Sequence, residues 1–351
     1  MTAAPYDAWF PAAAIDGTYG CDEAALRAVP PVPPPPGFAA TWRRWNESAR
    51  AVPAAPDLVP LGRIGAHEVS SLTFTASDGL RLRGWLAVPT SGAARVGIVH
   101  SHGYGGREAP DFARVPADAA VVFPVARGLG AVNAGVGAPE SKDEHVLHGI
   151  GSVDEYVLGR CASDLWSAAN ALDEVVGPLP HYVVGESFGG GIGALALPWD
   201  DRIVGATLIV PSFGQYDVRL DLQCEGSGEA VRRHVLAHPE AREVLRWFDA
   251  STAAAFARVP VRVEAALWDT FVPPPGQFAV ANAVAAAGDA APSSAAASVG
   301  DAAGTGAELE LAVLPAGHAE YPGLAEVRAA AEAATLRHIE RVLDRSRLAT
   351  G

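Results

Sequence analysis

Residues 182–190, with the sequence YVVGESFGG, decide the fold of this chain. An apolar run, Tyr182 to Val184, leads into the pattern G-x-S-x-G, and a segment of helical character follows it. Such an abrupt turn from strand to helix forces Ser187 into a strained backbone conformation, and only glycine at Gly185 and Gly189 lets the neighbouring chains approach. The pattern is typical of a serine hydroxyl held out at the end of a sheet, where the next helix N-terminus stabilises negative charge. An ordinary glycine-rich turn is the alternative.

Short apolar runs on both sides of this stretch predict a mostly parallel sheet, because strands buried on both faces read as continuous hydrophobic segments. Helical patterns lie between them at Ser152 to Val176, where Ser152 and Glu155 have capping-box spacing, and at Leu324 to Leu343. This alternation predicts an α/β fold with helices on both faces and a ligand site at the carboxyl ends of the strands. The predicted strands are Val69 to Thr75 and Leu80 to Val88, joined by the turn Ser77-Asp78-Gly79, then Val96 to His100, Ala120 to Val125, Tyr182 to Val184, Ala206 to Val210, Val261 to Leu267 and Leu309 to Leu314.

The chain divides into an N-terminal arm, residues 1–65, which we expect to pack on the core, and an α/β domain, residues 66–351. Within the arm, VPPVPPPPG at 29–37 lacks most backbone donors, which predicts a stiff extended connector; a proline ligand for a signalling partner is the alternative. Phe38, Trp42 and Trp45 follow it and are placed to cover the main domain. Residues 283–306 are low in complexity and predict a helix end followed by a flexible surface insertion near 285–307.

The composition opposes several other classes of function. The formal net charge of -14, with no basic run, opposes binding to nucleic acid or to an anionic membrane surface. Cys21, Cys161 and Cys224 form no CxxC pair, so neither a disulfide framework nor a zinc site is expected. The chain shows no signal-peptide pattern and no run of about 18 apolar residues, so we expect a cytoplasmic protein that does not cross a membrane.

A serine hydroxyl becomes a nucleophile only when a base removes its proton and a third group orients that base. In the fold that uses G-x-S-x-G in this context, an acid and then a histidine follow the serine in the chain. His318 comes directly after the last predicted strand, in a loop at the catalytic end of the sheet, and is the predicted base. The other histidines after Ser187 lie in helical segments rich in arginine and glutamate and are expected to be solvated: His234, His238 and His338.

Asp269 is the predicted acid, because it is the only carboxylate at the end of a predicted strand between Ser187 and His318. A plain turn-forming role is the alternative. A tetrahedral intermediate also needs donors for its oxyanion. We expect these to be the backbone N–H of Phe188 and that of Tyr104, in the sequence HGYGG at 102–106 after an earlier strand. His102 in that sequence is predicted to be structural rather than a base or a metal ligand.

These residues together resemble the acetyl xylan esterase and cephalosporin C deacetylase family of α/β-hydrolases, from about residue 35 to the C-terminus apart from the insertion. The resemblance implies an α/β-hydrolase fold, a catalytic triad of Ser187, Asp269 and His318, and oxyanion N–H groups from Tyr104 and Phe188. It also implies deacetylation of sugars and related small alcohols, no metal or other cofactor, and a homo-oligomer. Leu129 and Ala319 depart from the family pattern. The likeness rests on His102-Gly103-Tyr104-Gly105-Gly106, Arg127-Gly128, Gly185 to Gly190, Trp268-Asp269-Thr270 with Pro273-Pro274, and Gly317-His318.

The sequence thus predicts a serine-dependent carboxylic ester hydrolase that acts on a small-molecule ester by two-step acyl transfer. Loops around Tyr104, Phe213 and Phe271 are the candidates for shaping the substrate pocket. One alternative keeps the triad but passes the acyl group to an alcohol or amine, or cleaves a peptide or lactone. The other is a catalytically silent binding module, although such proteins usually lack one member of the triad.

Overall fold

A sheet of nine strands runs through residues 4–289 and 307–350, the parts of the chain that the computed structural model describes. The strands are β1 (Asp57–Ile64), β2 (His67–Thr75), β3 (Arg81–Pro89), β4 (Val96–His100), β5 (Ala119–Pro124), β6 (His181–Glu186), β7 (Ile203–Ile209), β8 (Pro260–Ala266) and β9 (Glu308–Leu314). Their order in the sheet is β1-β2-β3-β5-β4-β6-β7-β8-β9. The pairs β1–β2, β2–β3 and β3–β5 are antiparallel. The pairs β5–β4, β4–β6, β6–β7, β7–β8 and β8–β9 are parallel. The predicted, mostly parallel α/β sheet is confirmed.

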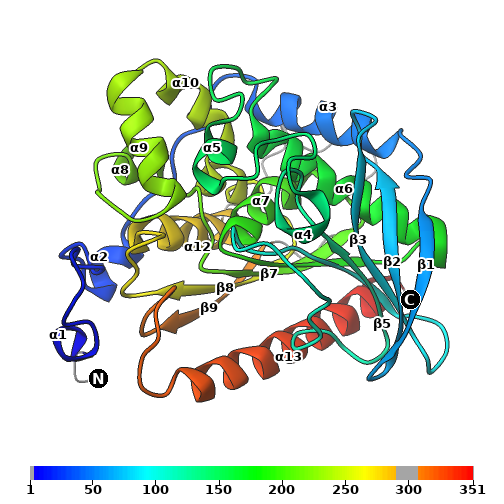
Figure 1. The fold of residues 1–351 in the computed structure, drawn as a ribbon. Coiled ribbons are helices and arrows are strands. Elements are labelled where there is room, and N and C mark those ends of the chain that lie inside the picture. Colours follow the sequence, from blue (N-terminus) through cyan, green and yellow to red (C-terminus); the bar gives the residue numbers. More distant parts are fainter. Residues whose placement is uncertain (1–3, 290–306, 351) are drawn as a thin grey trace.

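Helices cover both faces of this sheet (Figure 1). They are α1 (Tyr6–Trp9), α2 (Glu23–Arg27), α3 (Phe38–Arg50), α4 (Gly130–Asn133), α5 (Lys142–Leu147), α6 (Val157–Val176), α7 (Phe188–Ala196), α8 (Tyr216–Arg219), α9 (Ser227–Ala237), α10 (Ala241–Leu245), α11 (Ala250–Ala254), α12 (Pro274–Asp289) and α13 (Leu324–Thr350), with 3₁₀ turns at Leu197–Trp199 and Arg246–Phe248. Figure 1 shows α13 on one face, and α6, α7 and α12 on the other. No helix within the described ranges has both the length and the apolar character needed to cross a bilayer.

The core lies in two layers, one on each face of the sheet. Val183 of β6 belongs to the larger layer, which includes residues of α6 and α7, whereas its neighbours Tyr182 and Val184 pack with Ile339 and Val342 of α13. Successive side chains on a strand point to opposite faces. A strand covered on both sides therefore has to be apolar at every position, which is why the central strands could be found as continuous hydrophobic runs.

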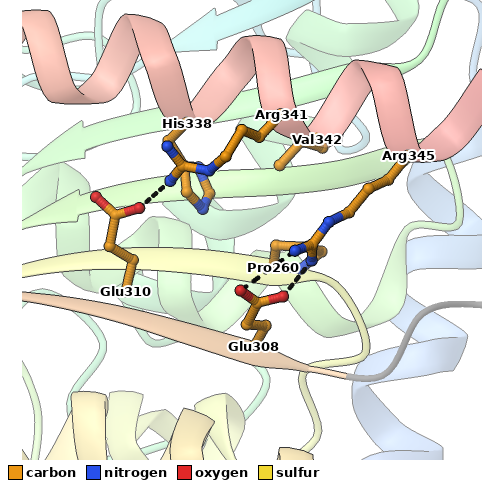
Figure 2. Close-up of a pocket in the computed structure, with 7 residues that line it drawn as sticks. All are labelled: Pro260, Glu308, Glu310, His338, Arg341, Val342 and Arg345. Carbon is orange, nitrogen blue, oxygen red and sulfur yellow. Dashed lines mark hydrogen bonds and ion pairs between the residues drawn. The ribbon is translucent and has the colours of Figure 1, made fainter.

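Ion pairs tie α13 to the edge strand β9. Arg341 binds Glu310 and Arg345 binds Glu308, as Figure 2 shows. The crevice between these side chains has a volume of about 10 Å³, which is no more than a single water molecule requires. Its residues therefore fasten a helix to the sheet rather than bind a ligand.

His338, on the same helix, is buried, and the prediction that it is a solvated surface residue is wrong. Its Nδ1 lies 2.6 Å from the hydroxyl of Tyr182, which lies 2.7 Å from Oγ1 of Thr207 on β7. Burial lowers the pKa of His338 to about 4. Its neighbours Arg337 and Arg341 are exposed, so the local composition misrepresents the burial of His338.

All eight predicted strands are confirmed, each within three residues of the predicted ends. Strand β1 was not predicted. Its residues are exposed along its whole length, and its register with β2 shifts between Pro60 and Gly62. Proline and glycine interrupt its apolar residues, so the sequence shows neither the unbroken run nor the alternation of a regular strand. The proposed boundary near residue 65 stays a prediction. Helix α12 reaches Asp289, and residues 290–306, where most of the predicted insertion falls, lie outside the described residues.

The long helix before β6 begins five residues later than predicted, at Val157. The carbonyl oxygen of Ser152 accepts bonds from the amides of Glu155 and Tyr156, at 3.3 and 3.0 Å, which forms a separate turn ahead of the helix. Tyr156 is the actual N-cap residue, with an extended backbone and no side-chain cap bond. The capping-box spacing of Ser152 and Glu155 therefore did not mark the helix start.

The aromatic residues after the proline-rich segment pack on the 3₁₀ turn Arg246–Phe248. Trp42 is fully buried and its Nε1 donates to the carbonyl oxygen of Trp247, 3.1 Å away. Trp45 stacks on Phe248 with ring centroids 6.1 Å apart. Helix α3 is thereby fixed onto the segment that precedes α11.

Candidate active site

The turn between β6 and α7 places Ser187 at the carboxyl edge of the sheet. Ser187 has φ 53° and ψ -113°, a strained conformation for a residue other than glycine. A Cβ at Gly185 would lie 2.3 Å from the carbonyl oxygen of Gly189, and one at Gly189 would lie 2.7 Å from that of His102. Both positions therefore exclude any side chain, which confirms the predicted reason for these glycines.

His318, in the loop after β9, lies against Ser187. Its Nε2 is 2.9 Å from the Ser187 Oγ, and its Nδ1 is 2.7 Å from Oδ2 of Asp269, in the loop after β8. Because a carboxylate only accepts hydrogen bonds, Nδ1 carries the proton and Nε2 is left to accept from the serine hydroxyl. Three residues far apart in the sequence thus form one hydrogen-bonded series.

The Asp269 carboxylate is fully buried and its direction is fixed by several donors. Its Oδ1 accepts from the amides of Phe271 and Val272, at 2.9 and 3.0 Å, and its Oδ2 accepts from Nε2 of Gln277, at 2.9 Å. Gln277 was not singled out in the sequence. Its role arises from the fold of α12 back onto this loop, and no motif marks it.

The surroundings of His318 raise its pKa above the ordinary value of 6.5. Burial on its own lowers the pKa, but the charge and hydrogen bond of Asp269 outweigh burial, and Glu186 adds to the increase. The imidazolium that forms when His318 accepts a proton is therefore stabilised by the site.

The loop at 102–106 lies beside Ser187, where the second oxyanion donor was predicted. A Cβ at Gly103 would lie 3.6 Å from that of Ser187. Within the described ranges, no protein acceptor is found for the amide of Tyr104 or Phe188. His102 is structural, as predicted: its Nε2 accepts from the amide of Ala126, at 3.0 Å, and burial lowers its pKa to about 4.

A buried hydrogen-bond chain holds the Tyr104 side chain. Its ring packs on that of Phe188 with centroids 4.5 Å apart, and its hydroxyl lies 3.2 Å from Nδ1 of His145. Nε2 of His145 donates to the carbonyl oxygen of Arg127, at 3.0 Å, so Nδ1 accepts from the tyrosine hydroxyl. Burial lowers the pKa of His145 to about 4. No pattern in the sequence marks His145, because the residues of α5 read as a charged surface turn.

Arg127 of the Arg-Gly motif lies beneath this chain. It forms paired hydrogen bonds with Asp164, at 2.8 and 2.7 Å, and a third with Asp78, at 2.7 Å. These bonds fix the backbone of Arg127, and through it His145 and Tyr104. Arg127 therefore supports the loop at 102–106 through His145 and Tyr104.

The other two pocket candidates lie in different surroundings. Phe213 is fully buried, and its ring packs edge-on against that of Phe188 with centroids 6.0 Å apart. Phe213 therefore supports the Phe188 ring. Phe271 is 37% exposed and its ring centroid lies 5.8 Å from that of His318.

A cavity of about 430 Å³ lies beside His318, between the sheet edge and α13. Gly317, His318 and Ala319 line it, together with Glu186, and Tyr104, Phe213 and Phe271 do not. Its charged wall is mainly acidic, with Asp111, Glu186, Glu264, Glu320 and Glu332 against Arg114 and Arg328. Within the described ranges, no three or more His, Cys, Asp or Glu side chains are grouped so as to hold a metal ion.

A strained serine, a histidine and a buried aspartate in series at the carboxyl edge of such a sheet define the class of serine α/β-hydrolases. The model of the acetyl xylan esterase (AXE1) family matches residues 29–290. The chain therefore belongs to the acetyl xylan esterase family, and it is a carboxylic ester hydrolase.

Comparison with solved structures agrees on the fold. Acetyl xylan esterase 1 from Thermoanaerobacterium sp. JW/SL YS485 is 18% identical with a TM-score of 0.72, over 92% of this chain and 98% of that one. Acetyl xylan esterase from Paenibacillus sp. R4 is also 18% identical, with a TM-score of 0.71 over 92% and 99%. Acylaminoacyl peptidase from Pyrococcus horikoshii is 14% identical with a TM-score of 0.57, over 79% of this chain but only 42% of that one. The α/β-hydrolase fold is shared by all three.

Proposed function

We propose that this enzyme deacetylates small or sugar-like acetyl esters, with Ser187 as nucleophile, His318 as general base and Asp269 as the residue that orients the base. The observation that carries the proposal is the hydrogen-bonded series from the Ser187 Oγ through the imidazole to the buried carboxylate. Family membership supports the acetyl ester as substrate class.

The reaction proceeds in two steps. Ser187 attacks the ester carbonyl while His318 Nε2 takes the hydroxyl proton, and the amides of Phe188 and Tyr104 donate to the oxyanion. His318 then gives that proton to the leaving alcohol, and the acetyl group stays on Ser187. A water molecule, deprotonated by the same imidazole, releases acetate and restores the serine.

The alcohol part of the ester occupies the cavity beside His318. The leaving oxygen must receive its proton from Nε2, so the alcohol lies on the imidazole side of Ser187. The volume of about 430 Å³ falls within the range of roughly 300–1,000 Å³ for small-molecule sites. The acidic wall favours neutral or cationic alcohols over anionic ones.

The acyl group is short because aromatic rings pack closely on the oxyanion side. Phe188 is fully buried between Tyr104 and Phe213, with centroids 4.5 and 6.0 Å away. We expect acetyl esters to be hydrolysed faster than butyryl or longer esters of the same alcohol, and a preference for long chains contradicts this assignment.

The test of the proposal is Ser187→Ala, assayed with p-nitrophenyl acetate and with a fluorophosphonate probe. We expect a loss of several powers of ten in kcat, no labelling, and unchanged circular dichroism. Ser167→Ala is the matched control, because Ser167 is a buried serine on α6 whose Oγ donates to the carbonyl oxygen of Ser163. Turnover by Ser187→Ala close to that of the wild type would overturn the assignment.

A further inference from the structure

The start of the described chain lies over the two loops that carry Asp269 and His318. We define the N-terminal strap as residues 5–19, which include α1 and end before α2. In Figure 1, α1 and α2 lie off the carboxyl ends of β8 and β9. The family model matches residues 29–290, so the strap lies outside the part of the chain that the family model describes.

The strap packs through two aromatic rings on the loop after β8, which carries Asp269 and which we call the acid loop. Phe10 stacks on Trp268, the residue before Asp269, with centroids 3.8 Å apart and planes at 22°. Tyr6 stacks on the same indole at 6.4 Å, and its hydroxyl donates to the carbonyl oxygen of Pro315, 2.9 Å away. The Tyr6 side chain therefore spans the loop after β8 and the loop after β9.

A third ring packs on the loop after β9, which carries His318 and which we call the base loop. Trp9 stacks on Tyr321, three residues after His318, with centroids 5.5 Å apart and planes at 16°. The base loop is itself bonded to the acid loop, because the amide of Gly317 donates to the carbonyl oxygen of Trp268, at 2.8 Å.

The backbone of the strap also contacts the acid directly. The amide of Asp269 donates to the carbonyl oxygen of Gly17, at 2.9 Å. A Cβ at Gly17 would lie 2.6 Å from the Trp268 ring and 2.9 Å from the Asp269 amide nitrogen. Glycine at 17 is therefore required for this close approach.

The rings of the strap belong to neither of the two large core layers. Tyr6, Trp9 and Phe10 pack with Trp268 and Tyr321 in a small separate cluster, and no residue of the strap belongs to the layers on the two faces of the sheet. Loss of strap contacts should therefore leave the sheet and its helices intact.

We propose that the N-terminal strap is a positioning element that holds the acid and base loops together, so that the Asp269 carboxylate stays on Nδ1 of His318. This inference rests on the proposed function of these residues. The strap acts through the loops, since its aromatic residues contact Trp268, Pro315 and Tyr321 rather than the reacting groups. A misplacement of about 1 Å in such a site can lower the rate about a hundredfold.

Loosening the two loops should also change the pKa of His318. The folded site raises the pKa of His318 because Asp269 outweighs the effect of burial. When the contact weakens, the pKa returns downward toward its ordinary value. A base that must be deprotonated then becomes active at lower pH, so the acid limb of the kcat profile moves to lower pH.

The experiment uses the full chain with two strap variants, Trp9→Ala combined with Phe10→Ala, and Gly17→Ala. The matched controls are Trp45→Ala, which removes another half-buried indole, and Gly151→Ala, whose added Cβ meets no atom within 4 Å. For each protein we would measure kcat, KM and the pH profile of kcat on glycerol triacetate, together with circular dichroism, the thermal midpoint and fluorophosphonate labelling.

We expect the strap variants to lose about tenfold or more in kcat with little change in KM and to shift the acid limb to lower pH, while the controls do neither. Trp9→Phe should retain most of the activity. Strap variants with wild-type kcat and pH profile, or controls that lose as much, overturn the strap proposal and leave the proposed function standing. A wild-type chain that neither turns over the ester nor labels at Ser187 overturns both.

Discussion

At the scale of single residues, the Asp269 carboxylate fixes the tautomer of His318, because it accepts a hydrogen bond from Nδ1. Asp269→Asn would put an amide donor near Nδ1, so the imidazole proton would move to Nε2 and no longer allow that atom to accept from Ser187. We expect kcat to fall about 10⁴-fold with the fold retained. Steady-state kinetics and circular dichroism check this, with the exposed Asp201→Asn as control, and a loss under tenfold would contradict it.

The raised pKa of His318 sets the acid limb of the pH profile. Activity needs neutral His318, so it should rise with pH through a midpoint above 6.5, the ordinary value from which the site raises the pKa. Glu186, exposed at the end of β6, contributes to that increase.

Glu186→Gln should therefore move the midpoint of kcat to lower pH. Glu47→Gln, on the exposed side of α3, serves as the control that should leave it in place. Measuring kcat from pH 5 to pH 8 tests this, and a shift to higher pH would show that Glu186 does not act on the imidazole by its charge.

The grouping of Ser187, Asp269 and His318 could be predicted because each lies at or shortly after the end of a parallel strand, and the carboxyl ends of such strands meet at one edge of the sheet. Gln277 and His145 could not be predicted, because their contacts depend on how α12 and α5 fold back onto the loops. The same holds for His338, since only the packing of α13 shows which of its faces is buried.

At the scale of elements, β8 carries a buried carboxylate that β9 lacks. Glu264, with a side chain 1% exposed, binds Arg114 through both oxygens, at 2.9 and 3.1 Å. Glu264→Gln leaves that guanidinium without its counter-charge, so we expect a loss of about 3 kcal/mol in the free energy of unfolding.

Glu308→Gln, which removes an exposed pair with Arg345, should cost under about 1 kcal/mol. Urea unfolding of both variants, monitored by circular dichroism, compares the two. Equal losses would mean that the exposed ion pair stabilises the fold as much as the buried one.

The elements themselves show where sequence patterns stop being informative. The central strands were found because burial on both faces demands unbroken apolar runs. The residues of strand β1 need not form an unbroken apolar run, since the strand lies exposed at the edge and is held by its backbone bonds to β2. The start of α6 was misplaced because Ser152 and Glu155 satisfy the spacing of a cap while forming a turn of their own.

At the scale of the whole molecule, the charge of -14 and the acidic wall of the cavity act on the substrate together. We expect an acetyl ester of a cationic alcohol to have a kcat/KM about tenfold above that of an anionic alcohol of equal size at low salt. The ratio should approach one as salt rises, since the Debye length falls from about 30 Å at 0.01 M to about 3 Å at 1 M. A ratio that does not respond to salt contradicts this.

His102, His145 and His338 share one property that reaches beyond catalysis: each is buried in the neutral form with a pKa of about 4. Unfolding exposes them to water, where the pKa is about 6.5. Between these values the unfolded chain binds protons that the native chain rejects, so lowering the pH destabilises the fold, by up to about 4 kcal/mol per pH unit for three such groups. A stock kept at pH 5 should therefore lose native molecules during storage, with a net uptake of protons on unfolding that titration calorimetry can measure.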